Sequence, residues 1–188
     1  MNIQIFYFFY NLSHKSNFFD WITVFITDTF DKIVLGLAAC YIIYLLSIHP
    51  YWKIKNILEK IWIVITITTS ILGAYIIAYI LKIIVHAPRP FVIHTDVSPL
   101  VLETSYSSFP SGHATLFFAL ATILYFYDRR TGLIFFLFAI LIAISRMVVG
   151  VHYPLDVLAG ALLGMVISWV LHRYILKSVS TIFLSKKQ

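Results

Sequence analysis

The chain has 188 residues, of which 61% are hydrophobic and 12% charged, and its formal net charge at pH 7 is +6. Its mean hydropathy of +0.91 leaves too little polar surface to cover a soluble globule of this size, so the composition indicates an integral membrane protein. No nucleic-acid partner is expected, because a basic footprint for nucleic acid needs a water-facing surface. The single cysteine, Cys40, excludes an intramolecular disulfide and a cysteine-based metal site.

The first 32 residues interrupt their apolar stretches with polar and charged side chains. These include Asn11, His14, Lys15, Asp20, Asp28 and Asp31. This pattern favours interfacial helices over a further membrane span. A secretory signal is not expected either, because the first ten residues hold no basic residue and no small-residue cleavage site follows.

Five longer apolar stretches follow, and each approaches the roughly 20 residues that cross a ~30 Å hydrocarbon core. We expect spans at residues 33–49, 58–85, 112–127, 132–149 and 155–175. The predicted fold class is all-α: a polytopic transmembrane helical bundle of about five spans, or six if residues 1–32 also cross. Because no repeat or linker divides the chain, residues 1–188 are expected to form one domain.

Charge predicts the orientation of these spans. One side collects nine of the 14 Lys and Arg residues against two acids, a net charge of +7, and the other holds five against six acids, a net charge of −1. The basic side comprises Lys53, Lys55, Lys60, Arg129, Arg130, Arg173, Lys177, Lys186 and Lys187. That side is expected to be cytoplasmic, because basic residues are retained on the inner face of a membrane.

The outer side carries the unusual residues. Its longest polar loop, residues 86–110, contains four prolines and cannot continue a helix. Three clusters lie here: Lys82 and Arg89 in "KIIVHAPRP"; Ser111, Gly112 and His113 in "PSGH"; and Arg146, His152 and Asp156 in "SRMVVGVHYPLD". Glu103 and Asp96, in the same loop, would either repel or help to place a diphosphate.

The cations of these clusters indicate an anionic partner. A single basic residue at a span end often extends along the interface into water. However, Lys82 and Arg146 are flanked by apolar sequence on the side where few cations are expected. An ionisable group held at such a position suggests a bound anion.

The "PSGH" stretch predicts a helix start suited to phosphate. Pro110 ends the loop, Ser111 is a favourable N-cap residue, and Gly112 lets a ligand approach the backbone. Free N–H groups and the positive end of the helix dipole then bind phosphate readily. The alternative for His113 is an ordinary polar residue at a helix end.

The third cluster predicts an oriented histidine. Pro154 suits a first helical turn, which places His152 just before the helix and Asp156 within it. A carboxylate that accepts from Nδ1–H leaves the Nε2 lone pair free to attack. The alternative is a structural hydrogen-bonded pair.

Together, these residues resemble the three-part signature of the type 2 phosphatidic acid phosphatase superfamily, over Lys82 to Asp156. The resemblance implies a metal-independent phosphatase without a cofactor that works through a phosphohistidine. By position, His152 would be the nucleophile, Asp156 its orienting partner and His113 the acid. The residues that would hold the phosphoryl oxygens are Lys82, Arg89, Ser111, Gly112 and Arg146.

Within the superfamily, the short chain and "SRMVVGVHYPLDVLAG" resemble bacterial undecaprenyl-diphosphatases, which recycle the cell-wall lipid carrier. The resemblance implies the bacterial inner (plasma) membrane, with the site facing outward towards the periplasm. Phosphatidylglycerophosphate, other phospholipids and lipid A phosphates are alternative substrates. A non-catalytic lipid transporter or scramblase is the alternative of another class, although it would not need an oriented His–Asp pair and a second histidine. The sequence indicates no oligomeric state.

Overall fold

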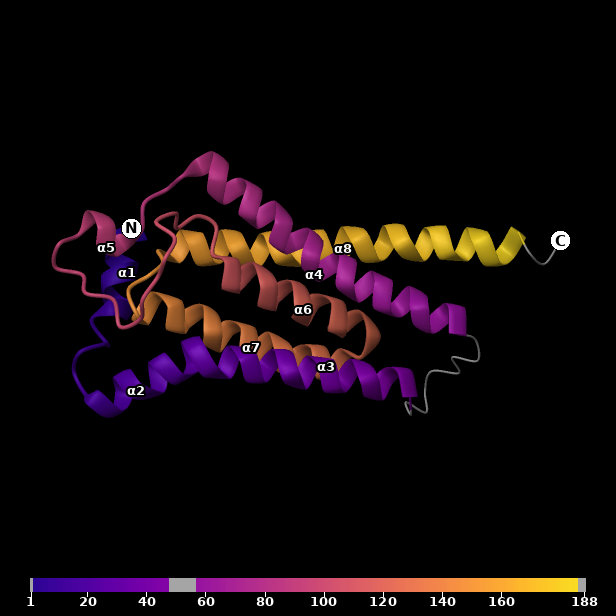
Figure 1. The fold of residues 1–188 in the computed structure, drawn as a ribbon, viewed down its shortest axis with the longest axis horizontal. Coiled ribbons are helices and arrows are strands. Elements are labelled where there is room, and N and C mark those ends of the chain that lie inside the picture. The colour runs from indigo at the N-terminus through magenta and orange to yellow at the C-terminus, as the bar shows by residue number, and fades with distance from the viewer. Residues whose placement is uncertain (1, 48–56, 186–188) are drawn as a thin grey trace.

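The computed structural model describes residues 2–47 and 57–185, with the side chains of residues 2–47, 57–58 and 60–175 among them (Figure 1). Its helices are α1 (Asn2–Tyr10), α2 (Asn17–Phe25), the π-helix η1 (Ile26–Phe30), α3 (Asp31–Ser47), α4 (Ile57–Val85), α5 (Pro90–Ile93), α6 (Gly112–Tyr127), α7 (Arg129–Val148) and α8 (Pro154–Ser185). The end of the first expected span at residues 48–49, and Lys53, Lys55, Lys186 and Lys187, lie outside the described residues.

The expected helical membrane bundle is confirmed. Within residues 2–47 and 57–185, four helical segments are long and apolar enough to cross a membrane: Asn17–Ser47, Lys60–Val85, Arg129–Val148 and Pro154–Ile175. The fifth expected span, α6, has 16 residues, or about 24 Å at 1.5 Å per residue, which is short of a ~30 Å core. It begins after the loop over residues 86–111, whose last residues are buried within the bundle.

The sequence predicts that the first span begins at residue 33, separate from the residues before it, and the structure differs on this point. Helix continues without a break from Asn17 through η1 to Ser47, so the first span shares one helix with the residues before it. The segment α1 is separate, and its Phe6 is fully buried, with its ring 5.4 Å from that of Tyr153. Placement of residues 1–32 at the membrane surface stays a prediction.

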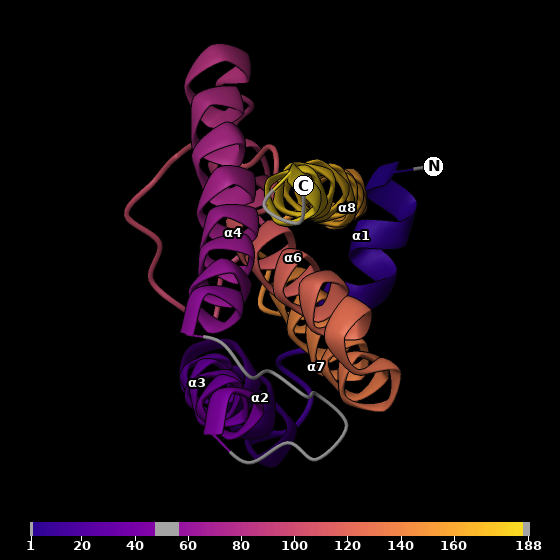
Figure 2. The ribbon, with the colours of Figure 1, turned by 90° about the vertical axis from the view of Figure 1, so that its right-hand side faces the viewer.

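The short helix α6 forms the centre of the bundle. Figure 2 shows it between α4, α7 and α8, with α3 below α4 and beside α7, and α6 has its largest contacts with α8 and α7. Nine of its residues are buried, as expected for a helix that faces protein on most sides. The main core joins three helices: Val34 and Ala38 of α3; Phe117, Leu120, Ala121 and Leu124 of α6; and Phe135, Ala139 and Ile142 of α7.

Two glycines set the close approach of α8 to α6. A Cβ atom added at Gly164 would lie 2.3 Å from the carbonyl oxygen of Thr115, and one at Gly160 would lie 2.5 Å from that of Ser111. Small residues four apart let membrane helices pack backbone to backbone. The glycines thus hold α8 against the start of α6.

The bundle has two chemically different ends. Figure 1 shows α1, α5 and the loop over residues 86–111 at one end, with the α6–α7 turn at the other. The turn holds Asp128, whose Oδ1 accepts from the Arg130 N–H at 3.0 Å and caps α7. The loop with the predicted site and the basic pair Arg129 and Arg130 therefore lie at opposite ends.

Replacing Gly164 with alanine is expected to lower the thermal unfolding midpoint in detergent. Its new methyl group would clash with backbone, and overpacking typically costs about 1–3 kcal/mol. The matched control is Gly36→Ala on α3, where nothing lies within 4 Å of the added Cβ, so its midpoint should not fall. Equal midpoints for the two variants would contradict the packing described here.

Candidate active site

A short-range network ties the end of α4 to the start of α6. The Ser108 N–H donates to the Ala87 carbonyl at 2.7 Å, beside an isolated antiparallel bridge between Pro88 and Ser107. Lys82 Nζ donates to the Ser107 carbonyl at 2.8 Å, and Ser107 Oγ donates to the Lys82 carbonyl at 3.0 Å. These bonds bring the first two sequence clusters together.

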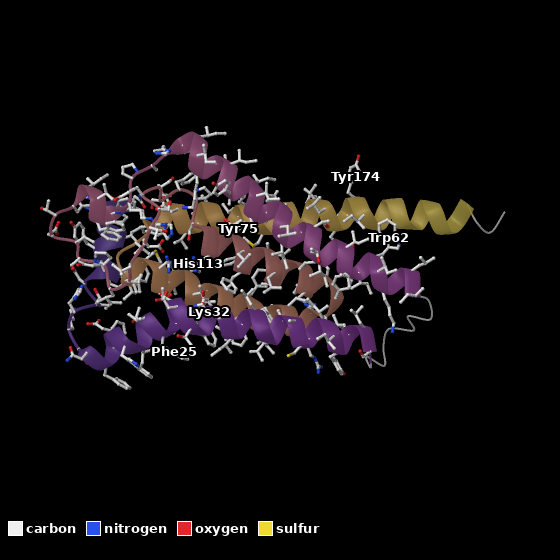
Figure 3. The ribbon with its side chains drawn as sticks, viewed as in Figure 1. Phe25, Lys32, Trp62, Tyr75, His113 and Tyr174 are labelled. Carbon is white, nitrogen blue, oxygen red and sulfur yellow. The ribbon has the colours of Figure 1, made fainter. Side chains whose placement is uncertain are left out.

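The three clusters surround one cavity of about 380 Å³. Six of the eight predicted site residues line it: Lys82, Arg89, Gly112, His113, Arg146 and His152. The other two, Ser111 and Asp156, lie directly behind the lining. Tyr75, Tyr79 and Leu116 add an apolar wall, and Figure 3 shows Tyr75 on α4 and His113 on α6 at this end of the bundle.

Two guanidinium groups meet over one carboxylate. Arg89 and Arg146 are 3% and 2% exposed. Arg89 donates to Glu103 Oε2 at 3.1 Å, and Arg146 donates to Glu103 Oε1. The sequence leaves open what Glu103 does in the loop. In the structure its side chain bridges both arginines.

The cationic wall keeps a positive excess. Lys82, Arg89 and Arg146 stand against Glu103 and Asp156, while the buried Nε of Arg146 has no hydrogen-bond partner. Burial lowers the pKa of Arg89 to about 10, so this guanidinium stays charged at neutral pH. Buried charge without full compensation favours an anion in the cavity.

His152, the predicted nucleophile, is 1% exposed. Its Nδ1 lies 3.6 Å from Asp156 Oδ2 and 3.3 Å from Ser108 Oγ, and Ser108 Oγ also donates to Asp156 Oδ2. The serine hydroxyl therefore bridges the predicted pair. With Nδ1–H donating to Ser108, the Nε2 lone pair faces Arg89 Nη1 at 3.3 Å.

Asp156 is held for this role from two sides. Its Oδ2 accepts from the Tyr153 N–H at 2.8 Å, and its carbonyl accepts from the Ser111 N–H at 3.0 Å. The second bond connects the start of α8 to the start of α6. Any movement of α8 relative to α6 would therefore disturb both motifs.

Burial and the nearby Arg89, Arg146 and Lys82 hold the pKa of His152 well below its usual 6.5. The imidazole is thus neutral at pH 7. A neutral imidazole is the nucleophilic form, because its lone pair is not occupied by a proton.

Helix α6 begins at the predicted residue, but its first turn is not capped by the predicted side chain. Ser111 is the N-cap residue, yet its side chain makes no capping hydrogen bond, so that part of the expectation is wrong. Backbone bonds hold Ser111 instead: its carbonyl accepts from the Thr115 N–H at 3.0 Å, and its buried Oγ has no partner. The N–H groups of Gly112, His113 and Ala114 precede the first intrahelical bond.

Across the cavity from His152, His113 is paired with an acid. Its Nε2 lies 3.5 Å from Oδ2 of Asp31, the first residue of α3. Its ring also stacks on Phe117, with centroids 6.5 Å apart. The contact crosses from α6 to α3.

Sequence reasoning assigned no site role to Ser108 or Asp31. Ser108 stands three residues before the Ser111 motif, and no local pattern marks it as a bridge to residues 152 and 156. Asp31 offered one signal, an acid at the start of an apolar helix, but its partner is 82 positions away. Among the described residues, no group of three or more His, Cys, Asp or Glu side chains is placed to hold a metal ion.

Comparisons with known proteins agree with this arrangement. A model of the PAP2 superfamily matches residues 62–180, a range that includes all eight predicted site residues. Undecaprenyl-diphosphatase BcrC of Bacillus subtilis is 33% identical over 174 residues, which cover 93% of this chain and 84% of that protein.

Two further matches cover different shares of the chain. The Bacitracin transport permease protein BcrC of Bacillus licheniformis is 32% identical over 133 residues, which cover 70% of this chain and 65% of that protein. The crystal structure of Aquifex aeolicus LpxE aligns with a TM-score of 0.67 at 27% identity, covering 92% of this chain and 95% of that one. By sequence and by architecture, the chain belongs to the PAP2 superfamily.

Proposed function

We propose that this multi-pass membrane phosphatase removes the terminal phosphate from undecaprenyl diphosphate through a phosphohistidine on His152. The observation that carries the proposal is the pair of histidines on one cationic cavity: buried His152 with its Nε2 lone pair free of protons, and His113 on the other wall. The similarity to an undecaprenyl-diphosphatase over 93% of the chain supports the substrate.

The geometry fits the binding of a phosphate head group. The cations Lys82, Arg89 and Arg146 surround the position in front of His152, and the N–H groups at the start of α6 add fixed donors. Phosphoryl transfer depends mainly on positioning and on stabilisation of charge over the equatorial oxygens. These groups supply both in a largely buried site.

The cavity volume favours a substrate whose long chain stays outside. About 380 Å³ lies near the lower end of the usual range for small-ligand pockets. A diphosphate head group fits there, whereas a long isoprenoid chain needs apolar surroundings beyond it. Tyr75 and Tyr79, which are 48% and 58% exposed, provide a partly apolar edge between the cavity and the bilayer.

The reaction has two steps. His152 Nε2 forms a bond to phosphorus while the bond to the bridging oxygen breaks, and His113 donates a proton to that leaving oxygen. Ser108 and Asp156 stabilise the charge that develops on the His152 ring. A water oxygen then forms a bond to phosphorus while the bond from phosphorus to His152 Nε2 breaks. The neutral His113 takes the proton from that water molecule.

We place the protein in the bacterial inner membrane with the cavity facing outward. The described basic residues at the opposite end, Arg129, Arg130 and Arg173, support this orientation. Phosphatidylglycerophosphate, other phospholipids and lipid A phosphates are the competing substrates. A transporter is the competing class, in line with the name of the Bacillus licheniformis relative.

The first test is turnover by the purified protein in EDTA. It is expected to release phosphate from undecaprenyl diphosphate faster than from phosphatidylglycerophosphate or phosphatidate at equal surface concentration. His152→Ala should lower kcat by at least about 10³-fold, because removal of a nucleophile eliminates the covalent route.

The matched control is His86→Ala, which changes an exposed histidine outside the cavity lining and should keep wild-type turnover. Equal activity of His152→Ala and wild type would overturn the mechanism. A preference for a different lipid would overturn only the substrate.

Activity is expected to follow a bell-shaped pH profile with an unusually low acid limb. Because the pKa of His152 is depressed, its reactive neutral form persists as the pH falls below 6.5 and is lost only at the lower folded-state pKa. On the alkaline side, kcat/KM falls when His113 loses the proton it donates. Measurement of kcat/KM from pH 4.5 to 9, with thermal unfolding at each pH as control, checks this. An acid limb centred at or above 6.5, or a flat profile, would contradict the paired roles.

Orientation can be tested with engineered cysteines in a Cys40→Ala background. Thr95→Cys in the exposed site loop is expected to react with a membrane-impermeant maleimide added outside intact cells. Arg130→Cys, exposed at the opposite end, should react only after the cells are opened. The reverse pattern would place the cavity in the cytoplasm.

A further inference from the structure

An acidic side chain lies inside the first apolar helical segment. Asp31 belongs to the candidate span Asn17–Ser47, and its side chain is 13% exposed. Ionisable groups within such a segment are costly and normally have a partner with a function. We propose that Asp31 is a positioning residue that orients the proton-donating His113 and supplies a counter-charge beside its ring, an inference that rests on the phosphatase function proposed above.

The contact itself supports this role. Asp31 Oδ2 lies 3.5 Å from His113 Nε2, which is close enough for an ion pair. It is also longer than a typical charge-assisted hydrogen bond. The carboxylate thus stabilises the protonated ring without holding its proton tightly, and Phe117 stacks on the ring.

A local irregularity places Asp31 at this point. The π-helical segment η1 ends at Phe30, directly before Asp31, and such segments often occur at functional sites. Within it, the fully buried Thr27 donates to Ser145 Oγ at 2.7 Å, so the segment is anchored on α7 beside Arg146. Figure 3 shows His113 facing the stretch of α3 that carries Lys32, the residue after Asp31.

The electrostatics of the cavity give such a carboxylate a role. The charged and titratable groups that line the cavity with His113 are Lys82, Tyr75 and Tyr79 of α4, Arg89 and Glu103 of the loop, Arg146 of α7, and His152. Lys32 lies beside Asp31, and Asp28 of η1 acts on Arg146. Glu103 already accepts from both arginines. Three cations therefore oppose a protonated His113, and Asp31 counteracts them from the α3 side.

The carboxylate stays ionised through the reaction. In the first step, the leaving oxygen takes its proton from His113 as the bond from His152 Nε2 to phosphorus forms. In the second, His113 takes a proton from water as the water oxygen bonds to phosphorus and the P–N bond breaks. Asp31 stabilises the imidazolium before the first step and after the second.

The test compares Asp31→Asn with Asp28→Asn, which removes the same charge one turn earlier in an exposed position. With undecaprenyl diphosphate in detergent micelles, Asp31→Asn is expected to lower kcat about 10- to 100-fold and to change KM by less than about threefold. Asp28→Asn should keep the wild-type kcat.

Two further measurements separate this role from folding and from the proposed function. Asp31→Glu keeps the charge, so it should restore most of the kcat lost in Asp31→Asn, and a kcat as low as that of Asp31→Asn would overturn the proposal. The ring NMR signals of isotope-labelled His113, assigned with His113→Gln, should move in Asp31→Asn and return towards wild type in Asp31→Glu. Unchanged signals in Asp31→Asn would overturn the role of Asp31, whereas a wild-type protein that hydrolyses no lipid phosphate would overturn the proposed function alone.

Discussion

Two buried guanidinium groups set the conditions for the rest of this bundle. Arg89 and Arg146 are almost fully inaccessible, and a charge at such a position costs several kcal/mol unless other groups compensate it. Glu103 supplies part of that compensation to both arginines. The loop that carries Glu103 must therefore fold back into the bundle, and α6 can begin only after that loop has turned. The shortness of α6 follows from this inward path.

The same arrangement links binding with stability. Glu103 and Asp156 do not fully neutralise Lys82, Arg89 and Arg146, so this part of the cavity carries an excess of positive charge. Under the proposed function, phosphate oxygens would compete with Glu103 for the same N–H groups. Since Arg89 also donates to the Val151 carbonyl at 3.0 Å, the backbone next to His152 is held by one of the two arginines that contact Glu103.

Much of the fold and site could be predicted because its signals are local. Long apolar runs specify helices in a membrane whatever their neighbours are, and the cations and histidines stand in short recognisable motifs. The roles of Ser108 and Asp31 could not be read in this way, since each depends on a partner supplied by a distant helix. Gly160 and Gly164 are four apart in the sequence, but the backbone that they contact belongs to α6.

The failed side-chain cap at Ser111 has a similar origin. Local propensity favours a serine hydroxyl that accepts from the first turn of the helix. Here the Ser111 N–H donates to the Asp156 carbonyl, and α8 packs within contact of the Ser111 carbonyl. Tertiary packing thus fixes this residue through its backbone, and its hydroxyl remains unpartnered beside the cavity.

The two histidines need opposite protonation states a short distance apart, and the fold separates them by surroundings. His152 lies at the buried end among the cations, which disfavour a proton on its ring. His113 is 35% exposed and contacts a carboxylate from α3. The difference does not come from the residue type, since both are histidines with the same reference pKa of about 6.5. It comes from which helix each faces: α7 and the loop bring arginines to His152, while α3 brings Asp31 to His113. If Asp31 orients His113 as proposed, the helical segment Asn17–Ser47 is part of the chemistry of the site, even though it lies outside the three motifs.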